Sequence, residues 1–270
     1  MRVVLLGKGG SGKSTLAGLL CAEIGARHGR VVAFDADTVP GLGPVLGMPV
    51  TDDWFLAGTA EREGGGWRLE GTPAEIVQRR ARRAPGGVRF LQIGNADATL
   101  GDFELHRESY LDRWSGTMAF NTVCRVFDDE DGWVVVDLQG GTLNVAGGMV
   151  GTTGVGLVVV EPFAKSVLTA RRFAGMAGWP PGVRLAGVAS KVTSPADEAY
   201  VREALDGLDI PLWGSVPLDP AVRQAERAGQ PVVGIDDSSP ARRAVAALVD
   251  RLEEAGGPAR PVPSASGDRA

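Results

Sequence analysis

The sequence predicts an α/β protein with a doubly wound, mostly parallel sheet flanked by helices. Three observations favour this class. Short apolar runs alternate along the chain with longer segments of helical periodicity, as in strand–helix–strand units. Several of these runs are apolar throughout, which is typical of parallel strands buried on both faces. Carboxylates or glycine-rich turns follow several runs directly, at the strand ends where open α/β sheets bind ligands.

Length, composition and charge limit the domain organisation and the kinds of partner that can be expected. The chain has 270 residues, of which 44% are hydrophobic and 23% charged, with a formal net charge of −5. We expect one domain over residues 1–255, with a less regular insertion at about 51–87 and a disordered Pro/Ser-rich tail at 256–270. The acidic balance argues against wholesale nucleic-acid binding, although a local basic patch remains possible.

Location is predicted from the same features. No apolar run reaches membrane-spanning length, and the chain begins directly in a strand rather than in a signal peptide. Cys21 and Cys124 form no spacing motif, so a disulfide framework is not expected and a reducing cytoplasm suits them.

The first strand, Arg2 to Leu6, leads into a glycine-rich turn and then into a helix from Ser14 to Arg27. The turn fits the phosphate-binding pattern G-x-x-x-x-G-K-[ST], whose backbone N–H groups surround phosphates beside a helix N-terminus. In this pattern Lys13 reaches the β- and γ-phosphates and Ser14 ligates Mg²⁺. The expected nucleotide-binding residues here are Gly7, Lys8, Gly9, Gly10, Ser11, Gly12, Lys13, Ser14 and Thr15.

Lysine is rare in this chain, which uses arginine almost everywhere else. The four lysines are Lys8, Lys13, Lys165 and Lys191, so two of them lie in the glycine-rich turn. Because an ammonium and a guanidinium differ chemically, these lysines mark places where arginine would not serve.

Two further strands end in carboxylates. The run Val31 to Phe34 delivers Asp35 and Asp37, and the run Trp133 to Val136 delivers Asp137. Carboxylates beside a phosphate site suit a Mg²⁺-bound water shell and the activation of an attacking water. After Asp137, the N–H of Gly140 is placed to meet the γ-phosphate.

Between these two strands, the sequence signals for helices and strands are weaker. A short helix from Pro73 carries Arg79, Arg80, Arg82 and Arg83, either as a solvated face or as a contact for a partner, an acidic lipid or nucleic acid. A third strand runs over 88–93. A helical region over 102–127 contains His106, a surface or packing residue.

The second half continues the alternation. Strands are expected at 155–160, 185–189 and 211–214. A helix follows Lys165, another starts at Pro195, a third runs towards Ala228, and a last one starts at Pro240 and continues through Leu252.

GKGGSGKST resembles the deviant Walker A loop of the ATPase superfamily that includes MinD, ParA, nitrogenase iron protein and the arsenite and tail-anchored-protein ATPases. The resemblance implies ATP and Mg²⁺ as ligands. It also implies that Lys8 crosses a dimer interface to the partner's nucleotide. FDADTVPGLGPVLG is similar to the family's switch I, which implies that Asp35 helps to hold the metal shell and Asp37 orients the hydrolytic water.

The segments VVVEPFAKSVLTARR, VASK and IPLWGSVPLDPAVRQAERAG resemble the carbon monoxide dehydrogenase maturation ATPases of the CooC type, over most of the chain except 51–126. In the wider family the segments matching Ser190-Lys191 and Val216-Pro217 border the adenine, with asparagine usual where Ser190 stands. CooC-type proteins also carry a paired-cysteine metal site, and this chain has only Cys124 in that region. The resemblance therefore extends to the ATPase and not to nickel handling.

The expected function is a Mg²⁺-dependent ATPase that forms an ATP-dependent homodimer and switches an unidentified client protein, as an accessory or maturation ATPase. One alternative is a ParA- or MinD-like positioning ATPase acting on DNA or a membrane surface. The tail supplies no basic amphipathic helix for a membrane, and only the arginine clusters would suit DNA. Another alternative is a small-molecule ATP-dependent enzyme, a class that usually lacks the residue matching Lys8.

Overall fold

The computed structural model describes residues 1–37, 39–49, 60–63, 66–92, 132–142, 145, 154–176, 179 and 182–257. Three sequence-based predictions lie outside these residues: the helical region at 102–127, the surroundings of Cys124, and the tail beyond Gly257.

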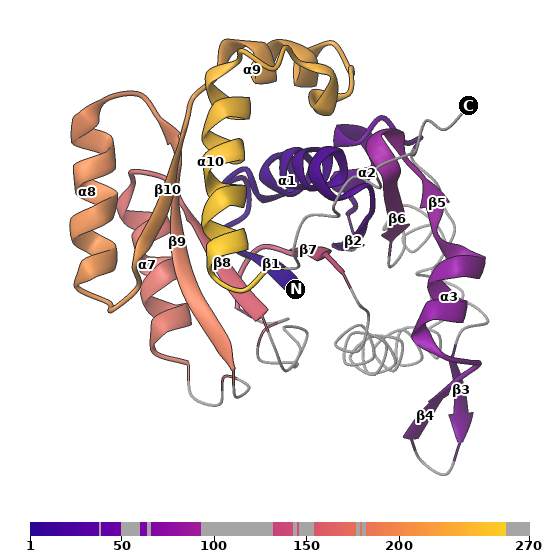
Figure 1. The fold of residues 1–270 in the computed structure, drawn as a ribbon. Helices are drawn as coiled ribbons and strands as arrows, with labels where there is room; N and C mark the ends of the chain where they lie inside the picture. The colour runs from indigo at the N-terminus through magenta and orange to yellow at the C-terminus, as the bar shows by residue number, and fades with distance from the viewer. Residues whose placement is uncertain are drawn as a thin grey trace, which may run out of the picture.

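Within the described residues, eight strands form one sheet in the order β10-β9-β8-β1-β7-β2-β6-β5. All neighbouring strands run parallel except β5, which is antiparallel to β6 at the edge. The strands are β1 (Arg2–Gly7), β2 (Val31–Ala36), β5 (Arg82–Arg83), β6 (Val88–Gln92), β7 (Val134–Leu138), β8 (Gly154–Val160), β9 (Val183–Val192) and β10 (Leu212–Pro217). The predicted fold class is confirmed, and β1 with its glycine-rich turn lies in the middle of the sheet (Figure 1).

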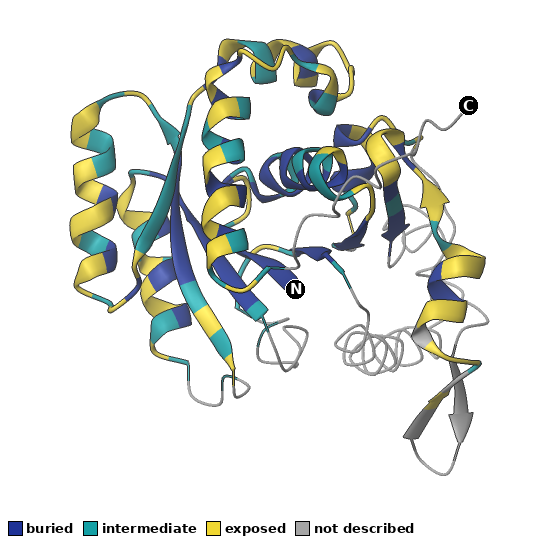
Figure 2. Ribbon diagram, viewed as in Figure 1, coloured by how far each residue is buried: buried dark blue, intermediate teal, exposed yellow. Residues whose placement is uncertain are grey.

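Helices cover both faces of the sheet because alternate residues of each central strand point to opposite sides. Val3 and Leu5 pack in a core with residues of α1 (Lys13–His28), α2 (Leu42–Val45), α9 (Pro220–Arg227) and α10 (Pro240–Glu254). Val4 and Leu6 belong to a second core with residues of α3 (Pro73–Arg80), α7 (Ala164–Ala174) and α8 (Pro195–Asp206). Two 3-10 turns, η1 (Pro85–Gly87) and η3 (Val232–Gly234), complete the described elements. The central strands are buried, and the helices expose their outer sides (Figure 2).

Helix starts follow the sequence signals closely. In α3, α8, α9 and α10 a proline occupies the first turn, and the capping side chain before it accepts a backbone N–H. The predicted starts at Pro195 and Pro240 are confirmed. Helix α1 differs, because its cap is Gly12 in the left-handed region, with φ 91°, and no side chain caps its N-terminus. The N–H groups of its first turn are therefore not committed to a capping side chain.

The prediction that the arginine cluster lies on one helix is wrong. Helix α3 ends at Arg80, Ala81 is extended, and Arg82 and Arg83 pair with Arg89 and Phe90 as strand β5. Pairing with β6 is a long-range contact, and it overrides the helical tendency of the local sequence. The insertion also contains a hairpin, β3 (Ala60–Glu63) with β4 (Gly66–Leu69), that the sequence did not indicate.

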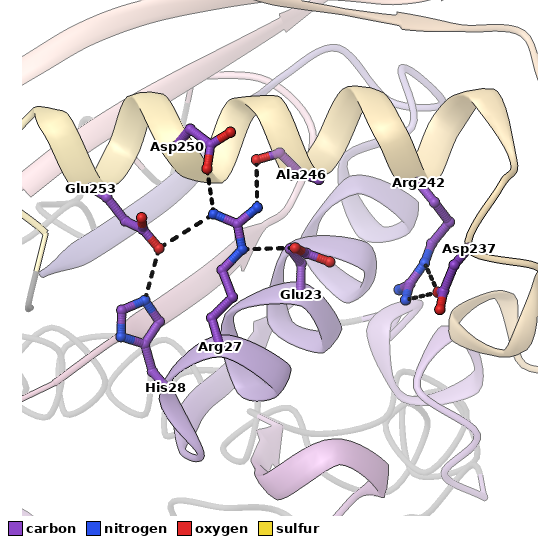
Figure 3. A network of polar contacts seen from close by, with 8 residues as sticks. All are labelled: Glu23, Arg27, His28, Asp237, Arg242, Ala246, Asp250 and Glu253. Atoms are coloured by element: carbon purple, nitrogen blue, oxygen red, sulfur yellow. Dashed lines mark hydrogen bonds and ion pairs between the residues drawn. The ribbon is translucent and has the colours of Figure 1, made fainter. Parts of the chain in front are cut away.

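An arginine joins the end of α1 to α10. Arg27 donates to Glu23 at 2.7 Å on its own helix, and to Asp250 at 2.6 Å and the Ala246 carbonyl at 3.0 Å on α10 (Figure 3). His28 lies 3.1 Å from Glu253 in the same network. These contacts fix the C-terminal end of α1 and so help to set the direction of the helix that starts at the glycine-rich turn.

Among the helices that the structure describes, none combines the length and apolar character needed to cross a membrane.

Candidate nucleotide-binding site

The glycine-rich loop, residues 7–12, joins the carboxyl end of β1 to the first turn of α1. Gly12 has φ 91°, a conformation that glycine adopts without strain. The segment after β7 approaches this loop closely, since a Cβ on Gly140 would lie 2.7 Å from the Gly9 nitrogen. The Gly141 N–H donates to the Gly7 carbonyl at 3.0 Å. The structure thus brings Gly140 to the loop, as the sequence predicts.

Lys13 carries its ammonium inside the protein. Its residue surface is 6% exposed, and its Nζ donates to the Lys8 carbonyl at 3.1 Å. Burial lowers the pKa of Lys13, while the nearby charges of Asp137 and Asp37 act to raise it. A buried ammonium at the mouth of a backbone loop is suited to an anion such as a phosphate.

Lys8 is placed differently, although it lies in the same loop. Lys8 is half-buried, and its Nζ donates to the Gly9 carbonyl at 3.2 Å in a solvent-exposed hydrogen bond. Unlike Lys13, it makes this contact at the surface of the loop.

Asp35 and Asp137 lie side by side on adjacent parallel strands, in register with each other. Both are buried, at 0% and 1% exposure. The Oδ1 of Asp35 accepts the Asp37 N–H at 3.1 Å, and its Oδ2 accepts the Leu42 N–H at 2.9 Å. Burial and the charge of Asp137 raise the pKa of Asp35. Asp35 thus anchors the segment after β2.

Asp137 has two buried carboxylate oxygens, and neither has a hydrogen-bond partner among the residues that the structure describes. Burial raises its pKa, with the Ser14 hydroxyl and the Lys13 charge acting in the opposite direction. Ser14 is half-buried beside it, close enough to affect this pKa without completing a hydrogen bond. Unpartnered buried carboxylate oxygens are costly, so they point to a missing donor such as a metal-bound water.

This donor set fits Mg²⁺, which prefers oxygen ligands and retains several waters. In the described part of the chain, no three His, Cys, Asp or Glu side chains converge in a way that could hold a metal. Mg²⁺ would therefore depend on phosphate oxygens as well as on Ser14 and waters near Asp137.

Asp37 follows β2 and is half-buried. Its Oδ1 accepts the Val39 N–H at 3.0 Å, and its charge acts on both Lys13 and Asp137. The side chain is therefore close to the loop yet open to water, which is the environment needed to orient a water molecule.

A cavity of about 70 Å³ opens beside α1. Its lining includes Gly12, Thr15, Val216 and Pro217, so the structure brings the predicted base-binding segment to the loop. Thr15 Oγ1 donates to Glu226 on α9 at 2.8 Å, which directs Thr15 to the wall of this cavity.

Ser190 and Lys191 also line this cavity, but they bond to the loop itself. The Ser190 hydroxyl donates to the Ser11 carbonyl at 2.8 Å. Lys191 Nζ donates to the Gly10 carbonyl and forms an ion pair with Glu161 at 3.0 Å.

Three acidic residues were not assigned a role from the sequence. Glu161 pairs with Lys191, Glu226 accepts from Thr15, and Asp219 caps the helix after β10. The sequence could have identified Glu161 as a candidate site residue, because it follows a buried apolar strand just as Asp35 and Asp137 do. The sequence could not have identified Glu226, because its partner Thr15 is 211 residues away along the chain.

Known proteins resemble this chain over most of its length. The chain is 27% identical over 276 residues to the carbon monoxide dehydrogenase accessory protein CooC of Rhodospirillum rubrum, covering 97% of this chain and 100% of that protein. Among solved structures, the cell division ATPase MinD of Pyrococcus furiosus has a TM-score of 0.66 at 21% identity, covering 94% of this chain and 99% of that one. MinD of Pyrococcus horikoshii, solved with Mg-ADP, has a TM-score of 0.65 at 19% identity, covering 95% and 97%.

The likeness to both MinD structures concerns the fold. The family evidence comes from the sequence, which matches the CobQ/CobB/MinD/ParA nucleotide binding domain over residues 3–232. The chain belongs to this family of MinD/ParA-type nucleotide-binding proteins.

Proposed function

We propose that the protein is a Mg²⁺-dependent ATPase that dimerises around ATP and switches a partner protein, as an accessory ATPase for another enzyme. The observation that carries the proposal is that a buried ammonium, on Lys13, lies near the buried Asp137 carboxylate beside the glycine-rich loop, with no hydrogen-bond partner on that carboxylate among the described residues. Such an arrangement matches the opposite charges of a triphosphate and its metal.

Each residue has a proposed part. The loop N–H groups, the start of α1 and Lys13 hold the phosphates. Ser14, with water on Asp35 and Asp137, would hold Mg²⁺, which neutralises charge on the phosphates when bound. Asp37 orients the attacking water, and Gly140 contacts the γ-phosphate.

The other residues act around this centre. Val216 and Pro217 border the base, with Ser190 and Lys191 beside them. Lys8 makes its hydrogen bond at the exposed surface of the loop, which supports a role at the nucleotide of a second copy. Similarity to the CooC accessory protein over nearly the whole chain supports the accessory class.

The test uses the purified full-length chain. A fluorescent ATP analogue should bind in the presence of Mg²⁺, and phosphate should be released from ATP. Sedimentation should show a monomer without nucleotide and a dimer with ATP. Failure to bind ATP with or without Mg²⁺ would overturn the proposal.

A further inference from the structure

Lys191 occupies an irregular position in the sheet. The parallel pairing of β9 with β10 places Ser190 opposite Val216 and Val192 opposite Pro217, so Lys191 is an extra residue between two registered pairs. Its φ is 56°, in the left-handed region, and among the described residues only Asp209 shares this feature outside glycine. Bulges re-aim side chains, and such backbone strain is concentrated at functional positions.

The bulge directs Lys191 onto the glycine-rich loop. Its Nζ donates to the Gly10 carbonyl and also contacts Glu161 Oε1 at 3.0 Å. The side chain of Glu161 is only 11% exposed, and it lies at the carboxyl end of β8, next to β1 in the sheet. A buried carboxylate needs a partner of this kind, so the ammonium is held between two acceptors.

Ser190, the residue before Lys191, also donates a hydrogen bond to a carbonyl of the loop. Ser190 donates to the Ser11 carbonyl at 2.8 Å, so two consecutive residues of β9 hold two consecutive carbonyls of the loop. In a trans peptide the carbonyl and the following N–H point in opposite directions. Holding these carbonyls towards β9 therefore turns the N–H groups of Ser11 and Gly12 the other way. The Ser11 N–H is indeed directed across the loop, to the Lys8 carbonyl at 3.2 Å.

We propose that the Lys191–Glu161 pair is a positioning device for phosphate binding, which holds the glycine-rich loop with its N–H groups turned inward. This inference rests on the proposed ATPase function. It adds Glu161 to the site and gives Lys191 a task other than recognition of the base. Three of the four lysines of the chain, Lys8, Lys13 and Lys191, then act at the glycine-rich loop.

The test compares three probes. ATP carries both base and phosphates, inorganic triphosphate lacks the base, and adenosine lacks the phosphates. Lys191→Met should weaken binding of ATP and of inorganic triphosphate by roughly 10-fold or more, as for loss of a charge-assisted hydrogen bond. Binding of adenosine should not change.

Companion variants separate positioning from stability. Lys191→Arg keeps a cation with several donors, but its guanidinium is larger and planar, so it should recover the ATP affinity only in part. Glu161→Gln should cause a smaller loss, because Lys191 keeps the Gly10 carbonyl. Glu161→Gln combined with Lys191→Met leaves no unpaired buried carboxylate, and it should be no weaker than Lys191→Met alone. If Lys191→Met lowers the melting temperature, the double variant replaces it in the comparison.

Matched controls change the same charges elsewhere. Lys165→Met removes an exposed lysine, and Glu254→Gln removes a carboxylate that is 66% exposed. Both should bind all three probes as the wild type does.

Two results would overturn the inference. A loss for adenosine equal to that for ATP, with inorganic triphosphate unaffected, would mean that Lys191 contacts the base. Unchanged ATP affinity in Lys191→Met would mean that the pair does not position the loop. Absence of ATP binding by the wild type is a different result, which contradicts the proposed function itself.

Discussion

At the scale of single residues, the site combines two buried charged groups that a ligand would stabilise. Lys13 is buried and satisfied by a loop carbonyl, while the oxygens of Asp137 are buried without partners. Each group carries a desolvation cost that a phosphate or a metal-bound water would offset. The site is thus suited to an anion and a cation at once.

The first prediction concerns Lys13. Lys13→Ala should abolish ATP binding, because it removes the buried cation of the loop. Titration with a fluorescent ATP analogue measures this, and Lys165→Ala, at an exposed position, serves as the control. Wild-type affinity in Lys13→Ala would contradict the assignment of the loop.

The second prediction concerns catalysis by Asp37. Asp37→Asn should keep nucleotide affinity and slow phosphate release by roughly 100-fold or more, as for loss of a general base. Asp35→Asn should affect binding instead, because Asp35 accepts two backbone N–H groups and anchors the segment after β2. If only Asp35→Asn stopped turnover, the two roles would be reversed.

At the scale of elements, one carboxylate connects two helices behind the cavity. Asp219 accepts the Ala221 N–H at 2.8 Å at the start of α9, and the Ser239 hydroxyl at 2.6 Å and the Ala241 N–H at 3.0 Å at the start of α10. Burial acts to raise the pKa of Asp219, but these hydrogen bonds outweigh it and hold the pKa below its ordinary value.

The third prediction follows from this double cap. Asp219→Ala should lower the free energy of unfolding by about 2 kcal/mol at pH 7, since each cap contributes about 1 kcal/mol. A carboxylate with a lowered pKa stabilises the fold above its unfolded pKa, and this contribution disappears as pH falls through the folded value. The difference from wild type should therefore narrow below about pH 4.

Urea unfolding at pH 7 and in acid measures both effects. Asp206→Ala is the control, because it removes an aspartate at an exposed position. A difference that stayed constant with pH would show that the charge of Asp219 is not involved.

Most of the elements could be predicted because their signals are local. Buried apolar runs such as Val31 to Phe34, and prolines at helix starts such as Pro240, are signals that depend only on neighbours in the sequence. The hairpin and β5 could not, because Ala60–Glu63 lacks β-branched residues and Arg82–Arg83 becomes a strand only by pairing with β6.

The candidate site divides in the same way. The loop residues and Asp137 lie at positions that their own strand and turn dictate, so the sequence could locate them. The partnership of Lys191 with Glu161 spans 30 residues and depends on a bulge that pairing with β10 creates. Neither the ion pair nor the bulge can be recognised from the local sequence.

At the scale of the whole molecule, the fourth prediction concerns Lys8. If Lys8 serves the nucleotide of a second copy, Lys8→Ala should bind ATP as a monomer with near-normal affinity. It should form no ATP-bound dimer and should lose hydrolysis by about 10³- to 10⁵-fold, as for cations supplied in trans. Sedimentation with ATP and phosphate release at several protein concentrations measure this.

Mixing provides the control for this prediction. In a mixed dimer of Lys8→Ala with Asp37→Asn, the first subunit keeps its own Asp37 and receives Lys8 from its neighbour, so one site is intact. Activity should reappear on mixing. A wild type that sediments as a monomer with ATP, with a specific activity independent of concentration, would instead indicate a nucleotide site that works alone.

The short strand β5 affects how readily the edge of the sheet can pair with a strand of another chain. It closes one edge of the sheet with two residues, Arg82 and Arg83, both exposed and both cationic. A strand from another chain that added to this edge would find a ladder only two residues long, flanked by two long charged side chains. The edge is therefore protected against the sheet-to-sheet growth that leads to fibrous aggregates.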